Sequence, residues 1–155
     1  ERSTENLIGA AVAFNHTYSP VDVVQATVVD EWGEVVPSNY DVYDRTFSED
    51  PSCMLDRSCL WLEASAYAES SWVGLITVIS QNDIQFRWVE TDQGWFMIQR
   101  SWLVEPADVS WESVEVNAQY FMAVIMEGNE SVRLQSIWID SDYGVLPVSE
   151  DFAKP

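Results

Sequence analysis

Lysine is almost absent from this chain, and cations of any kind are few. Six arginines and one lysine, Lys154, stand against 26 aspartates and glutamates, which leaves a net charge of −19 over 155 residues. Proteins that bind nucleic acids use Lys and Arg to neutralise phosphates, so this function is close to excluded. An anionic membrane surface is disfavoured for the same reason. A basic protein partner, a metal cation, a neutral sugar or solubility in salt could each account for the acidic surface.

Long apolar runs and histidines are also scarce. No apolar stretch reaches the 18 residues that suggest a membrane-spanning helix. The single histidine, His16, cannot form a His-rich metal site, and no nucleophile-elbow signature accompanies it. We therefore expect a protein that is not an enzyme and has no catalytic residues.

The chain does contain enough apolar surface for one folded domain. Apolar residues make up 47% of it, with eight Trp, six Tyr and six Phe. Disordered acidic chains lack such aromatic content. Because a chain of this length normally folds around one core, we expect residues 1–155 to form a single domain.

The two cysteines, Cys53 and Cys59, lie six residues apart. An even number of cysteines at short spacing, with no histidine nearby, predicts a disulfide rather than a zinc site. The disulfide would pin a long acidic loop that we predict over residues 37–59. Disulfides persist in oxidising compartments, so we expect an extracytoplasmic protein, periplasmic or secreted, whose chain starting at Glu1 is already processed.

The apolar pattern predicts strands along most of the chain, at residues 7–14, 21–29 and 72–80 and in a hairpin over 84–104. For the hairpin we predict a three-residue turn, Asp92-Gln93-Gly94, in which Gly94 takes a positive φ. This register pairs Thr91 with Trp95. It places Trp88 on the core face and Trp95 on the opposite, exposed face.

Two segments fit either a strand or a helix. Residues 60–68 contain alanines that suit a helix, and residues 111–126 show both a two-residue and a helical period. The β-branched valines favour a strand for the second segment. The predicted fold class is mainly β, an antiparallel sandwich or small barrel, with room for one helix.

One pattern could bind a metal ion. Asp140 and Asp142 stand in a D-x-D-x-G run that ends at Gly144, and two carboxylates at this spacing can bind one calcium ion. A polar turn at a strand end is the commoner origin of such a run. We therefore expect no cofactor and keep calcium as the alternative.

The N-terminal part resembles a known class of proteins. The segment Val12-Ala13-Phe14-Asn15-His16-Thr17, followed by residues 21–29 and Trp32-Gly33, is similar to the start of small bacterial periplasmic immunity proteins. The resemblance implies a non-enzymatic inhibitor that neutralises a toxin. An acidic β domain of this kind could be steered onto a basic protein partner.

Under this hypothesis one set of residues forms the partner-binding surface. The acidic ones would supply steering charge and the aromatic ones would supply anchors of the kind that dominate interfaces. The predicted set is Tyr40, Asp41, Tyr43, Asp44, Glu49, Asp50 and Trp95.

Two other functions fit the same composition. A carbohydrate-binding module would stack sugars on Trp32 and Trp95, with calcium at Asp140 and Asp142. A structural subunit of an extracellular surface assembly would instead pair its edge strands with those of further copies.

Overall fold

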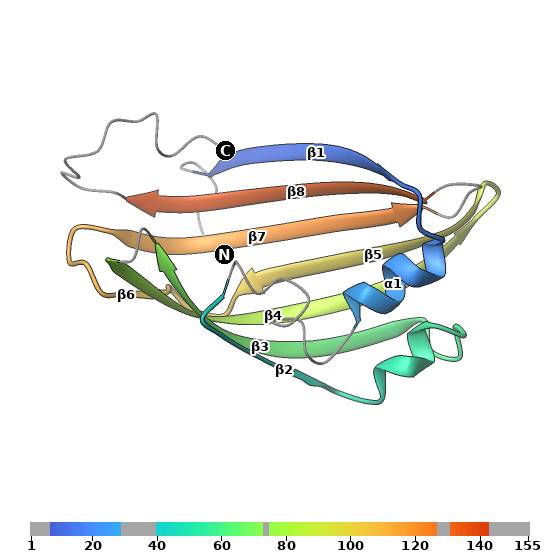
Figure 1. The fold of residues 1–155 in the computed structure, drawn as a ribbon, viewed down its shortest axis with the longest axis horizontal. Coiled ribbons are helices and arrows are strands. Elements are labelled where there is room, and N and C mark those ends of the chain that lie inside the picture. The colour runs from blue at the N-terminus through green and yellow to red at the C-terminus, as the bar shows by residue number, and fades with distance from the viewer. Residues whose placement is uncertain (1–6, 29–39, 73–74, 127–130, 143–155) are drawn as a thin grey trace.

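The computed structural model describes residues 7–28, 40–72, 75–126 and 131–142 (Figure 1). None of the helices in these ranges has the length and apolar character to cross a membrane. The elements, in chain order, are β1 (Ile8–His16), α1 (Pro20–Thr27), β2 (Val42–Phe47), the 3-10 helix η1 (Pro51–Met54), β3 (Trp61–Trp72), β4 (Ile76–Thr91), β5 (Gly94–Leu103), β6 (Asp108–Val109), β7 (Glu115–Met126) and β8 (Ser131–Asp142).

The strands form one open antiparallel sheet in the order β1-β8-β7-β5-β4-β3-β2, and the short β6 pairs with β4 beside this path. In Figure 1 the first strand, β1, lies at one edge beside the last strand, β8, and α1 crosses in front of the sheet. The two ambiguous segments are both strands, β3 and β7. The predicted mainly β, antiparallel class with one α-helix is therefore confirmed.

The pairing register defines two faces of the sheet. Residues that are directly paired across strands point to the same side, and neighbours along a strand alternate. We call the side against which α1 packs the inner face and the other side the outer face. One inner row runs across the sheet as Leu62, Phe86, Gln99, Ala123, Gln135 and Val12. The next row runs as Trp88, Met97, Ile125, Arg133 and Phe14.

The core occupies the part of the inner face over β3, β4, β5 and β7. Val23, Val24 and Val28 at α1 and Met54 of η1 pack there against the buried side chains of the sheet. Those sheet residues are Leu62, Ala64, Ala66, Ile84, Phe86, Trp88, Met97 and Ile125.

Helix α1 replaces the strand predicted over residues 21–29, and that prediction was wrong. The oxygen of Ser19 accepts a hydrogen bond from the backbone N–H of Asp22 at 3.2 Å, which caps the helix start. Val23 and Val24 are adjacent, and Val24 lies four residues before Val28, so these three valines share the buried face of a short helix. Packing against the sheet outweighs the β preference of valine.

The hairpin turn is also one residue shorter than predicted. Thr91 pairs with Gly94, so the turn consists of Asp92 and Gln93 alone, and Gly94 has a φ of +117°. The Thr91 hydroxyl donates to the Gly94 carbonyl at 2.9 Å and accepts from the Gln93 N–H at 3.2 Å. The one-residue change of register moves Trp95 onto the inner face with Trp88.

The loop predicted over 37–59 is partly regular. It contains β2 and η1, and its residues 37–39 lie outside the described residues. The predicted strand 72–80 is divided between the end of β3 at Trp72 and the start of β4 at Ile76.

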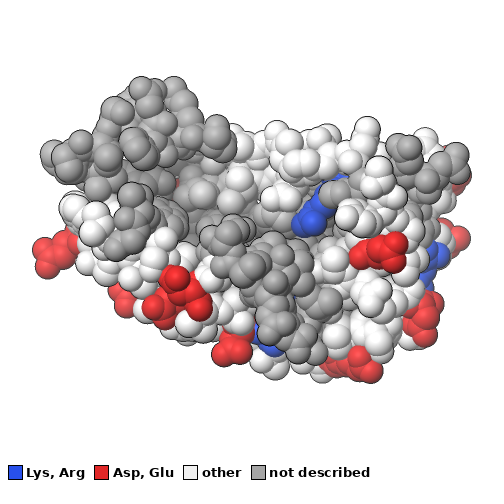
Figure 2. Space-filling model, viewed as in Figure 1, with Lys and Arg blue, Asp and Glu red and all other residues white. Residues whose placement is uncertain are grey.

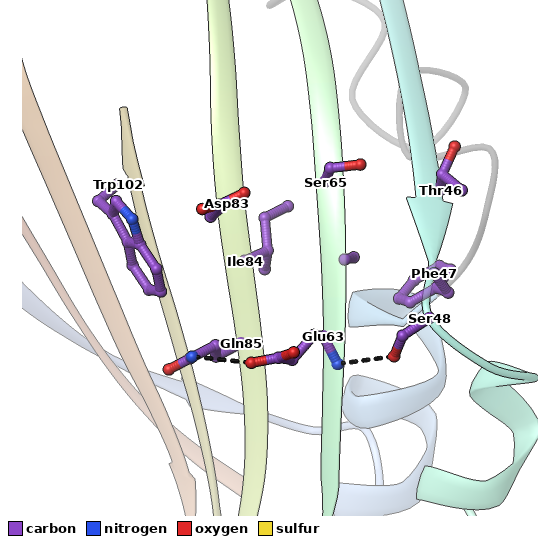
Figure 3. A pocket seen from close by; sticks show the side chains of 10 residues that line it. Thr46, Phe47, Ser48, Glu63, Ser65, Asp83, Ile84, Gln85 and Trp102 are labelled. Atoms are coloured by element: carbon purple, nitrogen blue, oxygen red, sulfur yellow. Dashed lines mark hydrogen bonds between the residues drawn. The ribbon is translucent and has the colours of Figure 1, made fainter. Parts of the chain in front are cut away.

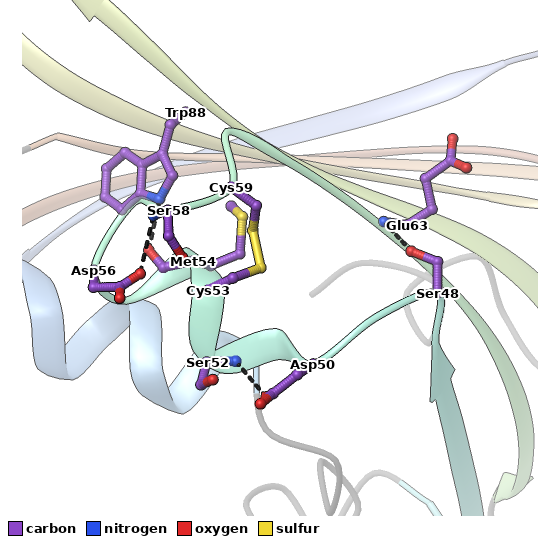
Figure 4. Close-up of a disulfide and its surroundings, with 10 residues drawn as sticks. All are labelled: Ser48, Asp50, Ser52, Cys53, Met54, Asp56, Ser58, Cys59, Glu63 and Trp88. Atoms are coloured by element: carbon purple, nitrogen blue, oxygen red, sulfur yellow. Dashed lines mark hydrogen bonds between the residues drawn. A yellow bond between two sulfur atoms is a disulfide. The ribbon is translucent and has the colours of Figure 1, made fainter.

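The predicted disulfide between Cys53 and Cys59 is present and closes a small loop after β2 (Figure 4). Asp50 and Asp56 each accept a backbone N–H at 2.9 Å, from Ser52 and Ser58, and these bonds lower the pKa of both carboxyls. A disulfide is typical of an oxidising compartment.

The loop is fixed onto the inner face by aromatic contacts. The indole Nε1 of Trp88 donates to the Met54 carbonyl at 2.8 Å, as drawn in Figure 4. The Arg57 guanidinium lies 4.7 Å from the Trp88 ring and 5.0 Å from the Trp95 ring, which is within cation–π range. One end of the inner face is thereby covered.

Replacing Trp88 tests this attachment. Trp88→Phe removes the indole N–H and leaves the buried Met54 carbonyl without its donor, so we expect a loss of about 1–3 kcal/mol in the free energy of unfolding. Urea unfolding measures it, with the exposed Trp61→Phe as the matched control, expected within about 0.5 kcal/mol of the parent. Equal effects of the two substitutions would contradict the attachment.

Candidate functional site

The inner face over β1, β7 and β8 is apolar and partly open. Three of its residues on the edge strand β1 remain exposed: Ile8 at 76%, Val12 at 46% and Phe14 at 42%. They are paired with Ile139, Gln135 and Arg133 of β8, which are half-buried. Where Figure 2 draws described residues over β1 and β8, they are mostly uncharged, while the carboxylates gather toward the lower edge and the two ends of the molecule.

A buried glutamine lies on β5, where this apolar face borders the core. Gln99 of β5 is only 6% exposed and stands in its row between Phe86 and Ala123. Within the described part of the chain, its side-chain Oε1 has no hydrogen-bond partner. Buried amide groups normally have one, so this group is a feature that requires an explanation.

An arginine lies on the neighbouring row, two strands away from Gln99. Arg133 of β8 is half-buried between Ile125 and Phe14, and its Nε has no hydrogen-bond partner among the described residues. Burial lowers the pKa of its guanidinium, because desolvation disfavours the charged form. The face therefore combines apolar walls with one amide and one cation.

A second arginine holds α1 over the other side of this face. The buried Arg45 of β2 donates from Nη1 to the Thr27 carbonyl at 2.9 Å, at the C-terminal end of α1. Its Nη2 and Nε donate to the Tyr43 hydroxyl at 2.7 and 3.1 Å. A cation at this end of a helix also interacts favourably with the negative end of the helix dipole. Arg45 thus fixes which part of the face α1 covers.

The residues around Arg45 are aromatic. Its guanidinium lies 5.7 Å from the Phe47 ring and 5.9 Å from the Phe86 ring. Tyr40 packs on Tyr43 with ring centres 4.8 Å apart. Burial raises the pKa of Tyr40, with a smaller contribution from Tyr43 in the same direction and an opposing one from Arg45. This cluster is structural, because its polar groups bond to one another and to α1.

The outer face carries a separate shallow groove of about 310 Å³ (Figure 3). Gln85 donates to the Glu63 carboxylate at 3.1 Å, and the Ser48 hydroxyl accepts from the Glu63 backbone N–H at 3.3 Å. Among the described residues, no buried polar atom of this groove lacks a partner. The groove lies open in the sheet surface and is lined by Thr46, Phe47, Ser48, Glu63, Ala64, Ser65, Asp83, Ile84, Gln85 and Trp102.

The predicted partner-binding residues do not share one surface. Asp41, Asp44, Glu49 and Asp50 are exposed, whereas Tyr40, Tyr43 and Trp95 are half-buried. Tyr43 and Trp95 pack against the core, and Trp95 makes an edge contact with Trp88 at 6.3 Å. The acidic residues remain a predicted steering surface. Trp32, the other predicted sugar-stacking residue, lies outside the described residues.

The two aspartates predicted to bind calcium lie at the end of β8. Asp140 is paired with Ala118, and Asp142 with Glu115. Within the described ranges there is no group of three or more His, Cys, Asp or Glu side chains placed to hold a metal ion. Gly144, which completes the sequence pattern, lies outside those ranges.

Comparison with known proteins identifies the fold but no family. No protein-family model and no curated protein matches the sequence. Among solved structures, a STAR-related lipid transfer protein from Xanthomonas axonopodis matches with a TM-score of 0.58 and 9% identity, covering 95% of this chain and 83% of that one. A major latex-like protein from Panax ginseng matches with a TM-score of 0.51 and 8% identity, covering 88% and 80%. The likeness is one of fold.

Sequence reasoning missed both Gln99 and Arg133. The predicted register put Gln99 on the exposed face of the hairpin, and no role was predicted for Arg133. A two-residue turn would have placed Gln99 beside Phe86. The available signal was a polar residue at a position that alternation assigns to the buried, otherwise apolar face.

Removal of Arg45 tests how α1 is held. Arg45→Met keeps the length of the side chain but leaves the Thr27 carbonyl and Tyr43 hydroxyl without their donor, so we expect unfolding free energy to fall by about 2–4 kcal/mol. Arg100→Met, at an exposed position of β5, is the charge-matched control and should change it by less than about 1 kcal/mol. Chemical unfolding followed by tryptophan fluorescence gives both values; equal values would show that Arg45 does not hold the helix.

Proposed function

We propose that this protein is a non-enzymatic binding protein for a small apolar or amphipathic molecule, which it holds on the inner face of the sheet. The observation that carries the proposal is the amide of Gln99, buried on an apolar face with an acceptor that no described residue satisfies. Leaving such a group unpaired costs about 1–3 kcal/mol, and a ligand with a hydrogen-bond donor would recover that energy.

The composition of the face supports this proposal. Small-molecule sites are largely apolar, with a few polar groups that fix the orientation of the ligand. Here Phe121, Ile137 and Ile139 supply half-buried apolar walls, and Gln99 and Arg133 supply the polar groups. The exposed β1 residues Ile8, Val12 and Phe14 continue the same apolar surface to the edge of the sheet.

The fold also supports it. The Xanthomonas protein, whose name describes lipid transfer, shares the arrangement of the sheet at a TM-score of 0.58. With 9% identity no residue role can be transferred, so the argument rests on the residues of this chain. The disulfide and the acidic surface suit an extracytoplasmic carrier, so we propose that the protein acts outside the cytoplasm.

A ligand on the inner face is better supported than the inhibitor hypothesis from the sequence. The aromatic anchors assigned to a protein partner, Tyr43 and Trp95, pack against the core instead of projecting from the surface. The acidic residues around them are left as a charged surface without an aromatic centre, whereas binding hot spots combine the two.

A charge placed on the inner face tests the proposal. Val12→Asp adds a carboxylate to the exposed apolar stripe, so binding of the neutral dye N-phenyl-1-naphthylamine should weaken by roughly 10-fold or more, because the charge loses hydration when the dye covers it. Dye fluorescence titration measures the affinity.

The matched control is Leu134→Asp on the outer face of the adjacent strand. Leu134 is 43% exposed, close to the 46% of Val12, and the substitution changes the net charge equally. We expect its dye affinity to equal that of the parent. Absence of dye binding to the parent, or equal weakening by both substitutions, would contradict a site on the inner face.

A further inference from the structure

Arg133 is the sole Lys or Arg in the three strands that form the open half of the inner face, β1, β7 and β8. In a chain of net charge −19 an isolated, half-buried cation is unusual, because 26 carboxylates are available to pair with it. Buried charges are normally paired, since desolvation is costly for a lone ion. The position of Arg133 therefore calls for a negative partner that the described chain does not supply.

The carboxylates of these strands are kept away from Arg133. The inner-face positions of β1, β8 and β7 that surround it carry no Asp or Glu: they are Ile8, Ala10, Val12, Phe14, Gln135, Ile137, Ile139, Gln119, Phe121, Ala123 and Ile125. The nearest acid along its own strand, Asp140, is seven residues away, which is about 24 Å of extended chain and beyond the screening length of about 8 Å. As far as the described residues of these strands go, an anion at Arg133 would thus meet an attractive charge and no inner-face carboxylate.

Resting on the proposed function, we infer that the ligand is an amphipathic carboxylic acid, with its carboxylate on the Arg133 guanidinium and its apolar tail along the inner face. The buried Nε of Arg133 lacks a hydrogen-bond partner among the described residues. A guanidinium can donate two parallel hydrogen bonds, from Nε and a terminal nitrogen, to the two oxygens of one carboxylate. Phe14 and Ile125 lie on either side of Arg133 and offer the tail an apolar surface.

The charge of the site favours a carboxylate over a phosphate monoester. One guanidinium neutralises one negative charge, which a carboxylate carries at neutral pH. A phosphate monoester carries about −1.5 to −2, so an uncompensated fraction of its charge would enter the apolar face. Both headgroups use the same hydrogen-bond donors, so their relative affinities distinguish them.

Displacement of N-phenyl-1-naphthylamine from the parent protein by dodecanoate, methyl dodecanoate and dodecyl phosphate tests the inference. We expect dodecanoate to bind about 10- to 100-fold more tightly than its methyl ester, the range of a charge-assisted hydrogen bond. Equal affinity of acid and ester, or tighter binding of the phosphate, would overturn the carboxylate assignment while the proposed function stands. Failure of the dye and of all three compounds to bind would overturn the proposed function itself.

Substitutions locate the headgroup. Arg133→Gln should remove the preference for dodecanoate over its methyl ester, whereas Arg133→Lys should retain part of the preference. Arg100→Gln on the exposed surface of β5 changes the net charge equally and should behave as the parent. Loss of the preference in Arg100→Gln, or its retention in Arg133→Gln, would show that general charge and not Arg133 binds the acid. If Arg133→Gln does not fold, the parent and Arg133→Lys titrations still decide the question.

Discussion

The structure depends on one constraint: a single open sheet has an apolar face wider than its only described α-helix. Helix α1 has eight residues and is about 12 Å long, whereas the seven strands of the main path span about 29 Å. Arg45 and the disulfide loop fix α1 and η1 over the part of the face formed by β2 to β5 and the adjoining end of β7. Apolar side chains on β1 consequently stay exposed, and this geometry creates the candidate site.

This arrangement determines which polar groups of the inner face are bonded within the protein and which have unsatisfied atoms. Arg45 and Gln99 are both buried, but Arg45 bonds to Thr27 and Tyr43 and holds the fold together. Gln99 has an acceptor that no described residue satisfies, and Arg133 has an Nε in the same state. Groups of the first kind explain stability. Groups of the second kind reduce stability when nothing is bound, and they are best explained by binding.

The sequence was sufficient for the fold class and the disulfide, and insufficient for the site. The β-branched valines favoured a strand where β7 lies, and two closely spaced cysteines predicted the disulfide, because both signals are local. Valines 23, 24 and 28 suggested a strand because their helical role depends on a sheet formed by distant residues. The turn after Thr91 was set one residue too long, and that single error moved Trp95 and Gln99 to the wrong face. Arg133 lies beside Phe14 only because β1 pairs with β8 across more than a hundred residues, a contact that no local pattern encodes.

Methyl NMR of the protein titrated with dodecanoate is the most direct measurement of the central claim, that a small amphipathic molecule binds the inner face. Neighbouring residues on β1, β7 and β8 alternate between the faces, so their methyl groups distinguish them. We predict that the methyl signals of Val12, Ala123 and Ile137 shift on the inner face while those of Ala11, Val124 and Leu134 on the outer face stay in place. Shifts confined to the outer face, or none at saturating concentration, would contradict the account.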